Sequence, residues 1–394
     1  MPIAKNIKLL SLLNFCTDFV FFAPVAILYF AQVTGSYALG MSIFSLAYVS
    51  SAIIEVPTGI VSDLVGRKKT TILGAASSVL CVTLYAIGGS YWWLAAGALL
   101  QGLSRAFYSG NNDALLHDTL REIGKENEYH TYLGKTSSMF QIALAAASLM
   151  GGFMASQSYS LVMWASVIPQ IGALVIAIKL VEPSINSRSN TNMFAHIREA
   201  LGEFKKNYRL RLLTLASSMR FGLGESGYFL RSAFISTLWP LWAIGVASAL
   251  SNVGAAWSYF YGGRLIDKFR PLRVLNIEII SNRIVNLTAL FFPTVVSPIL
   301  MNSTSLFFGA GSVAMNSLLQ KEFTQAQRAT MSSLNAFAGG IVFGIASIIL
   351  GVLADRFDAR TALIITNLVL LIPLFFYRKI FLHERVNGGR IETS

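Results

Sequence analysis

Residues 59–69 read Gly-Ile-Val-Ser-Asp-Leu-Val-Gly-Arg-Lys-Lys, a polar stretch that directly follows a long apolar run. Residues 263–270, Gly-Arg-Leu-Ile-Asp-Lys-Phe-Arg, follow an apolar run in the second half of the chain in the same way. Both stretches place an aspartate four residues after a glycine and add basic residues beyond it. A third version begins at Gly351 and a fainter one at Gly151. These matches predict two halves that repeat one design, each with a nested repeat.

The composition indicates that lipid surrounds most of the chain. Of 394 residues, 54% are hydrophobic and 13% are charged, whereas soluble domains carry roughly 25% charged residues. A soluble core could not bury that much apolar surface, because even large domains leave much of their area wet.

The spacing of charges predicts the spans. Five segments lack Asp, Glu, Lys, Arg and His altogether: residues 19–54, 70–104, 136–178, 232–263 and 284–320. One span needs about 20 residues, so most of these segments suit a hairpin of two helices. We therefore expect an all-α membrane protein with twelve transmembrane helices in two six-helix halves.

The charge-free segments and the polar turns set the limits of the expected helices. These helices cover residues 8–31, 38–62, 70–88, 91–114, 131–155, 160–181, 210–233, 240–263, 272–292, 296–319, 328–353 and 360–378. We expect residues 1–181 and 209–394 to form the N-terminal and C-terminal six-helix bundles. Residues 182–208 are polar and then amphipathic, which predicts a cytoplasmic linker with a helix along the inner membrane surface.

Basic residues set the orientation. The net charge of +12 comes from short clusters in every second loop and at both ends, the pattern that keeps loops cytoplasmic. We expect a multi-pass protein of the cell inner membrane with both termini in the cytoplasm. This distribution argues against nucleic-acid binding. The loop at 355–360 departs from the pattern, although its charges cancel.

The first stretch resembles the signature loop of the major facilitator superfamily, and the residues that carry the resemblance are Gly59, Asp63, Gly66, Arg67 and Lys68. The basic residue that usually follows the aspartate is Leu64 here. With twelve spans and a central linker, the resemblance covers nearly the whole chain and is nearest to bacterial drug:proton antiporters. It implies that this loop helps to hold a cytoplasmic gate in the outward-facing state.

Further residues are expected at the cytoplasmic gate. Asp113, His117 and Asp118 follow the fourth span and could complete a charge network with Arg67 or Lys68. In the second half, the matching positions of the repeat are Gly263, Arg264, Asp267 and Lys268.

Ionisable residues inside the membrane are functional candidates, because each costs at least about 2.5–3.5 kcal/mol to insert. They are Asp18, Glu55, Arg105, Arg220, Glu225, Arg231, Glu278 and Arg283.

Asp18 is the first candidate for a proton carrier, since a carboxyl group in an apolar cavity can take up and release protons. Its alternative role is a structural hydrogen bond to a neighbouring helix. Glu55 is the second candidate, and Arg105 could pair with either acid. The resemblance implies that spans 1, 4, 7 and 10 line a central cavity. The candidate cavity residues are Asp18, Arg105, Tyr108, Arg220 and Glu225.

These features predict a secondary transporter that works by alternating access and couples protons to efflux of a small amphiphilic molecule. An alternative is a proton-coupled symporter of a small organic anion held by Arg105, Arg220 or Arg231, since arginine's fork suits a carboxylate or phosphate. An alternative of another class is a membrane receptor or scaffold.

No catalytic constellation, metal-ligand spacing or ATP-binding motif stands out. We expect no enzyme activity and no cofactor, with a proton gradient as energy source, and a monomer in the bilayer.

Overall fold

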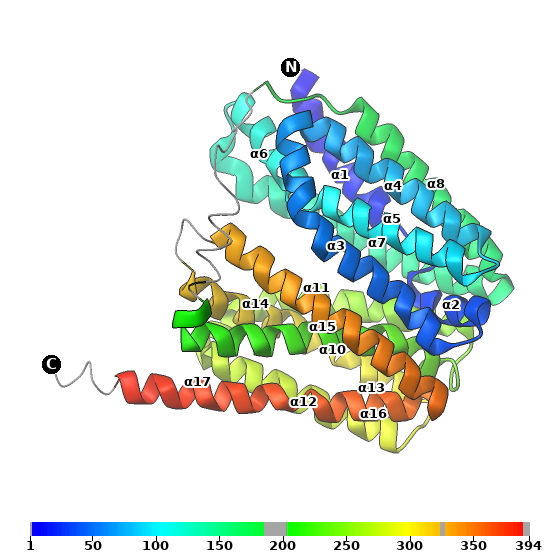
Figure 1. The fold of residues 1–394 in the computed structure, drawn as a ribbon, viewed down its shortest axis with the longest axis vertical. Coiled ribbons are helices and arrows are strands. Elements are labelled where there is room, and N and C mark those ends of the chain that lie inside the picture. Colours follow the sequence, from blue (N-terminus) through cyan, green and yellow to red (C-terminus); the bar gives the residue numbers. More distant parts are fainter. Residues whose placement is uncertain (1, 185–201, 203, 324–327, 389–394) are drawn as a thin grey trace. The chain divides into compact units, whose positions relative to one another are not determined.

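The computed structural model describes residues 2–184, 202, 204–323 and 328–388, and this part of the chain contains helices and no strands (Figure 1). Helices are expected in lipid because they satisfy every backbone N–H and C=O within one segment. The prediction of an all-α fold is confirmed.

The helices of the first half match the predicted spans in order, with short 3₁₀ turns at Pro2–Ala4, Ala23–Val25 (η2) and Glu126–Glu128. Their bounds are α1 Lys5–Asp18, α2 Ala26–Thr34, α3 Tyr37–Val65, α4 Arg67–Ile87, α5 Tyr91–Tyr108, α6 Asn111–Glu122, α7 Tyr129–Gln157 and α8 Tyr159–Lys179. Two spans differ from the prediction. Span 1 is divided between α1 and α2, and span 4 ends at Tyr108, after which α6 begins as a separate helix.

The helices of the second half complete the twelve spans. Their bounds are α10 Tyr208–Ile235, α11 Leu241–Phe269, α12 Pro271–Phe291, α13 Ser297–Ser303, α14 Ser305–Glu322, α15 Arg328–Arg356, α16 Ala359–Val369 and α17 Ile372–Gly388. Span 10 consists of α13 and α14, and span 12 consists of α16 and α17. The predicted linker helix falls largely at residues 185–201 and 203, outside the described part, whereas residues 204–206 are described and helical.

Eight of the described spans are apolar enough to cross a membrane by length and composition alone: Lys5–Thr34, Tyr37–Glu55, Arg67–Ile87, Thr131–Gln157, Tyr159–Lys179, Pro271–Phe291, Thr330–Arg356 and Ala359–Leu382. The other four are α5, α10, α11 and α14, which occupy the places of spans 4, 7, 8 and 10. α5 and α10 carry charged residues, and α11 and α14 are rich in Gly, Ser and Asn. Such helices suit a polar interior better than contact with lipid.

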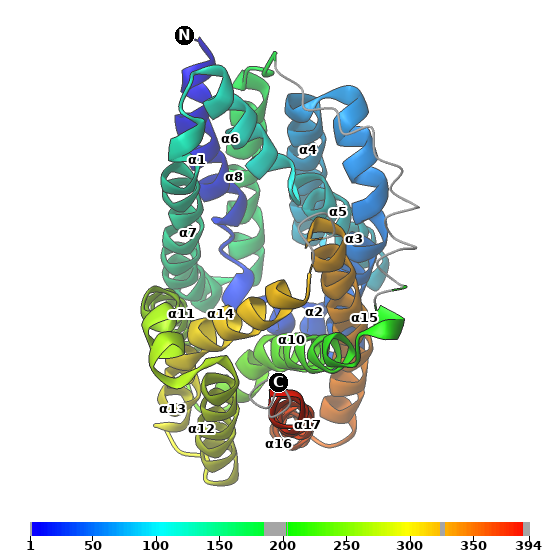
Figure 2. The ribbon, with the colours of Figure 1, turned by 90° about the vertical axis from the view of Figure 1, so that its left-hand side faces the viewer.

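The described contacts divide the chain into two compact units. Unit 1 comprises Met1–Ser189 with Ile235–Asn252, and unit 2 comprises Asn190–Phe234 with Val253–Ser394. In unit 1, helices α1, α6, α7 and α8 run beside one another (Figure 2). These helices share a core that includes Leu13, Leu115 and Ala177. In unit 2, an equivalent core includes Leu213 and Leu275.

The predicted repeat is visible in the backbone. One residue, Gly66, joins α3 to α4 with a φ of 100°, and one residue, Arg270, joins α11 to α12 with a φ of 64°. Arg270 is the one non-glycine residue with positive φ in the described part of the chain. Both halves therefore make the same left-handed turn between their second and third spans.

Candidate functional site

Asp18 is the last residue of α1, at a break in the first span. Phe19 has ψ of 66° and leaves the helix, and the chain turns helical again at Ala23, the start of η2. Pro24 follows at once. Proline lacks the N–H that a continuous helix would need as a donor at this position, so a continuous helix through this segment is disfavoured.

Buried side chains of α8 satisfy the backbone at this break. Gln170 donates from Nε2 to the carbonyl oxygens of Cys16 and Thr17 at 3.1 and 3.2 Å. Its Oε1 accepts a hydrogen bond from Ser78 at 2.7 Å, and Ser166 Oγ accepts one from the Phe21 N–H at 3.1 Å. These hydrogen bonds stabilise the break, because they give its backbone polar groups partners within the membrane.

α7 approaches the same break closely. A Cβ added at Gly151 would lie 1.8 Å from the Phe21 carbonyl oxygen, so this position accepts no side chain without a backbone shift. The faint repeat noted at Gly151 coincides with this contact.

The side chain of Asp18 lies near residues of α5. The Arg105 guanidinium interacts electrostatically with the Asp18 carboxyl, and the Tyr108 hydroxyl lies beside Thr17 and Asp18. Arg105 also stacks over the Tyr48 ring at 4.2 Å. The structure thus brings three of the predicted cavity residues together in unit 1.

Glu55 lies on α3, where its Oε1 accepts a hydrogen bond from Ser109 Oγ at 3.1 Å. One turn further along, Thr58 donates to the Ala106 carbonyl oxygen at 3.1 Å. Glu55 therefore joins α3 to the end of α5.

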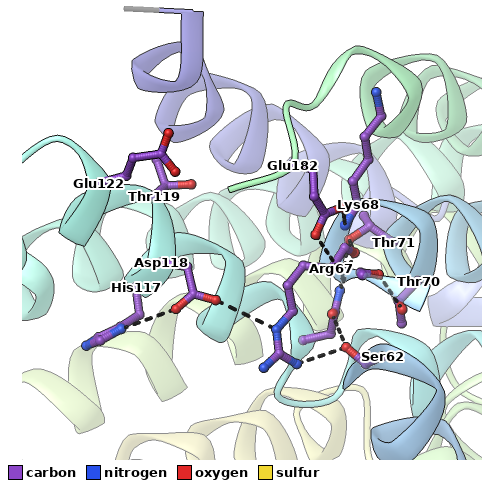
Figure 3. A network of polar contacts seen from close by, with 12 residues as sticks. Ser62, Arg67, Lys68, Thr70, Thr71, His117, Asp118, Thr119, Glu122 and Glu182 are labelled. Carbon is purple, nitrogen blue, oxygen red and sulfur yellow. Dashed lines mark hydrogen bonds and ion pairs between the residues drawn. The ribbon is translucent and has the colours of Figure 1, made fainter. Parts of the chain in front are cut away.

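The predicted gate loop forms a polar network that joins the end of α3, the start of α4 and α6 (Figure 3). Arg67 lies at its centre. Its Nη1 donates to Ser62 Oγ at 2.9 Å, and its Nε lies 3.8 Å from Asp118 Oδ2. Asp118 lies on α6, so Arg67 connects the start of α4 to the helix that follows α5. The side chain of Asp63 lies outside the described part.

Glu182, just beyond α8, binds the first turn of α4. Its two carboxylate oxygens accept the backbone N–H groups of Arg67 and Lys68 at 2.7 and 2.8 Å. A carboxylate is favoured there because a helix N-terminus carries partial positive charge and unsatisfied N–H groups. A Cβ at Gly66 would lie 2.9 Å from Glu182 Oε1, so the glycine leaves room for this acid.

Buried Asn111, at the start of α6, connects the network internally. Its Oδ1 accepts a hydrogen bond from Ser62 at 2.7 Å. Its Nδ2 donates to Thr71 Oγ1 and to the Arg67 carbonyl oxygen at 2.9 and 3.1 Å. One amide thus holds the end of α3 and the start of α4 against α6.

The segment after α8 is also fixed from two other sides. Asn6 exchanges two hydrogen bonds with the backbone of Val181, at 2.7 and 2.9 Å. Glu122 Oε2 accepts the Ser184 N–H at 2.7 Å. The first residues of the predicted linker are therefore attached to α1, α4 and α6.

His117 extends the network outward, with Nδ1 at 3.8 Å from Asp118 and Nε2 at 3.4 Å from Glu126. No ion pair joins Asp113 to another described residue. Asp118, rather than Asp113, is the acid that meets the gate loop.

The second-half repeat has a different environment. Gly263, Arg264, Asp267 and Lys268 are exposed at the end of α11, where Arg264 and Lys268 lie over the rings of Phe260 and Phe269. Glu322, at the end of α14, binds Arg209 at 3.0 Å and accepts a hydrogen bond from Asn207 at 2.9 Å.

Arg220 forms a buried ion pair with Glu278 in unit 2. Nε and Nη2 donate to the two Glu278 carboxylate oxygens at 3.3 and 3.4 Å. Arg220 also donates to the Phe308 carbonyl oxygen and to Ser312 Oγ on α14.

A cavity of about 380 Å³ opens in front of Arg220. Its lining combines polar and apolar side chains from α10, α11, α14 and α15, among them Ser217, Tyr259, Ser312, Met315 and Asn335. A second cavity, of about 570 Å³ in unit 1, contains none of the predicted site residues in its lining.

Other charges of unit 2 lie beyond the ion pair. Arg231 donates to the Met301 carbonyl oxygen at 3.0 Å and interacts electrostatically with Glu225. Arg283 lies within electrostatic reach of Glu278, Arg231 and Arg220. The structure therefore groups Arg220 with Glu278 and Arg231 with Glu225.

Sequence reasoning missed several of these partners. The sequence places Glu182 in the linker. Gln170 and Asn111 carry no charge, so a search for ionisable residues does not find them. A buried amide within an apolar run was the available signal for Gln170. The sequence identifies Glu278 as an intramembrane acid but predicts no partner for it.

The sequence model of the Major Facilitator Superfamily matches residues 9–347. The sequence has no significant match among curated proteins.

Several solved structures share the fold. A nucleoside transporter, NupG, superposes with a TM-score of 0.80 at 14% identity over 96% of this chain and 100% of that one. A bacterial homolog of the human lysosomal transporter Spinster, inward-facing and unoccupied, gives 0.77 at 15% identity over 96% of each chain. The E. coli fucose:proton symporter FucP gives 0.60 at 18% identity over 96% and 99%.

The matched length, the twelve helical spans and these neighbours agree, and the chain belongs to the Major Facilitator Superfamily: it is a multi-pass membrane transporter and not an enzyme.

Proposed function

We propose that this transporter couples proton movement to the export of a small amphiphilic organic molecule by alternating access. The observation that supports the proposal most is the position of Asp18. This carboxyl group ends a half-helix inside the first span, beside Arg105 and Tyr108. Broken helices with an ionisable group at membrane depth are typical sites of ion or proton coupling.

In this mechanism Asp18 takes up a proton when the site opens to one side and releases it on the other. The charge of Arg105 favours the ionised carboxylate, so movement of Arg105 toward a substrate would favour protonation. Occupancy of the site and protonation would then be linked. Glu55, which accepts a hydrogen bond from Ser109, is the second proton candidate.

The gate network supports alternating access. Arg67, Asp118, Glu182 and Asn111 tie together the cytoplasmic ends of several unit 1 helices. We propose that the loop at 59–69, with Asp63, forms contacts in one state that break in the other. Asp63→Asn should then slow turnover more than it weakens binding, and turnover equal to wild type would refute the role.

The lining of the unit 2 cavity supports an amphiphilic substrate. Val313, Met315 and Leu319 provide apolar contact, whereas Ser217 and Asn335 provide hydrogen-bonding groups. Ligand pockets commonly combine an apolar lining with a few polar anchors. We propose that this substrate is exported from the cell.

The test uses purified protein in proteoliposomes with an imposed pH gradient. A ligand found in a thermal-shift screen should be moved against its gradient when protons flow in the opposite direction. Dissipation of the proton gradient by an ionophore should abolish this accumulation. A ligand that binds without accumulating under any gradient would favour the receptor alternative.

A second candidate is proton-coupled symport of an organic anion, favoured by the position of Arg220 on the cavity wall. The similar structures include the fucose:proton symporter, so the fold accommodates symport. The two candidates differ in one measurement. In symport, ligand and protons accumulate on the same side of the vesicle membrane.

We further propose residence in the inner membrane as a monomer with both termini cytoplasmic. Single cysteines introduced near Lys5 and Lys379 should react with an impermeant reagent only after the inner membrane is opened. A cysteine at Asp358 should react in intact spheroplasts.

A further inference from the structure

The Arg220–Glu278 pair separates two different environments in unit 2. Arg220 lies on the cavity wall, whereas Glu278 does not line the cavity and is 5% exposed. α14 makes room for both side chains at Gly311, where a Cβ would lie 2.8 Å from Arg220 Nη2 and 2.9 Å from Glu278 Cδ. The guanidinium therefore has a cavity on one side and a buried carboxylate on the other.

The contacts of Arg220 leave capacity for a further acceptor. Its five N–H donors meet four acceptor atoms among the described residues: the two Glu278 oxygens, the Phe308 carbonyl oxygen and Ser312 Oγ. The contacts to the carboxylate measure 3.3 and 3.4 Å, longer than the roughly 2.7–2.9 Å of a strong charge-assisted bond.

The cavity offers groups that suit a carboxylate beside Arg220. Ser312 Oγ accepts from Arg220, so its own hydrogen can be donated to a ligand. Asn335 donates to Ser217 at 3.3 Å, and its Oδ1 is buried without a hydrogen-bond partner in the described part of the chain. Asn335 Oδ1 can therefore accept a hydrogen bond from the remainder of the ligand.

We infer that a carboxylate-bearing ligand in this cavity takes the place of Glu278 at Arg220, and that Glu278 then takes up a proton. The inference rests on the second candidate proposed above, symport of an organic anion, because ligand and proton bind together, and it specifies the group of unit 2 that takes up the proton. One negative charge and one proton enter together, so the charge of unit 2 is unchanged by occupancy.

Charge balance is the reason for the exchange. A buried carboxylate that loses its cation is far more costly than a protonated one. The groups that face Glu278 are Arg220 on α10, Asn282 and Arg283 on α12, and Tyr377 on α17, with Tyr259 of α11 beside Arg220. Asn282 Nδ2 lies 3.1 Å from Glu278 Oε1, and the fully buried Tyr377 hydroxyl has no hydrogen-bond partner among the described residues.

The test measures ligand binding by the purified full-length protein at a series of pH values. The probes are benzoate, hippurate and hexanoate, each compared with its neutral amide. In the wild-type protein at least one acid should bind while its amide does not. Its affinity should fall by up to about tenfold for each unit rise in pH, because one proton accompanies each ligand.

Two variants separate the roles of the pair. Glu278→Gln mimics the protonated acid and should bind the same carboxylate more tightly, without the dependence on pH. Arg220→Gln in the Glu278→Gln background removes both charges, which protects folding, and should not bind it. Ser312→Ala should weaken binding about tenfold, the loss expected for one hydrogen bond to a charged group.

The inference fails if none of the acids binds to Glu278→Gln, if the amides bind equally well, or if the pH dependence persists in that variant. Proton-driven transport is measured separately with Asp18→Asn. If that transport depends on Asp18 but the ligand is neutral or cationic, the proposed function stands and the exchange at Arg220 is wrong.

Discussion

The Glu182 carboxylate accepts the backbone N–H of Arg67 at 2.7 Å, although 115 positions separate the two residues in sequence. This contact fixes the start of α4 to the segment that leads into the second half of the chain. It places a residue from the beginning of the predicted linker directly on the gate loop. The state of the gate and the position of the linker are therefore expected to change together.

Substitution of Glu182 should destabilise unit 1. Glu182→Gln keeps the shape of the side chain but loses its charge and one acceptor for the α4 N-terminus. We expect a loss of about 1.5–3 kcal/mol, the range for hydrogen bonds to charged groups, measured as a lower thermal unfolding midpoint in detergent. Glu128→Gln is the control, since Glu128 is exposed and its ion pair among the described residues is with Lys125, three positions away. An unchanged midpoint for Glu182→Gln would show that the contact does not hold α4.

Arg67 and Asp118 should be energetically coupled. Their side chains lie 3.8 Å apart, and Asp118 is nearly fully buried. Arg67→Gln and Asp118→Asn should each slow transport, and the double variant should lose less than the sum of the two. A coupling energy of about 0.5–3 kcal/mol is typical for residues in contact. Strict additivity of the two effects on turnover would contradict a shared role at the gate.

Asp18→Asn should separate exchange from proton-driven movement. The amide keeps the size of the side chain but cannot carry a proton, so exchange of labelled for unlabelled ligand should continue while accumulation driven by a pH gradient stops. Both are measured in the same proteoliposomes. Asp358→Asn is the control, since that exposed aspartate caps α16. Gradient-driven accumulation by Asp18→Asn at the wild-type level would remove Asp18 from the coupling mechanism.

Gln170 should be essential for the break in the first span. Gln170→Leu keeps a similar volume but leaves the carbonyl oxygens of Cys16 and Thr17 without their donor inside the membrane. Each unsatisfied buried group costs about 1–3 kcal/mol, so the unfolding midpoint should fall strongly. Gln157→Leu, at an exposed position, should change it little. Equal stability of the two variants would mean that other groups or water satisfy the break.

Gly311→Ala should displace the Arg220–Glu278 pair, because its Cβ would overlap both side chains. Overpacking of a buried site costs about 1–3 kcal/mol, and carboxylate binding should weaken in parallel. Gly224→Ala is the matched control, since no atom lies within 4 Å of a Cβ there. Wild-type binding and stability in Gly311→Ala would show that the pair has room to move without loss.

The class of fold and the order of the spans follow from the sequence alone. Lipid acts on each segment separately, through its length, its apolar content and the charges at its ends. Five charge-free segments and alternating basic loops are therefore sufficient to predict twelve helices in two halves. The candidate charges Asp18, Arg105 and Arg220 were found for the same reason.

The pairing of these residues depends on how the helices pack in three dimensions. The break after Asp18 depends on Gln170 and Gly151, which come from two other helices, and Glu182 meets the α4 N-terminus only because α8 ends beside it. Partners such as Glu278 for Arg220 depend on which faces of different helices pack together. A hydrogen bond or an ion pair acts over a few ångströms in space, whatever the separation in sequence. A local sequence pattern therefore does not predict which residues it joins.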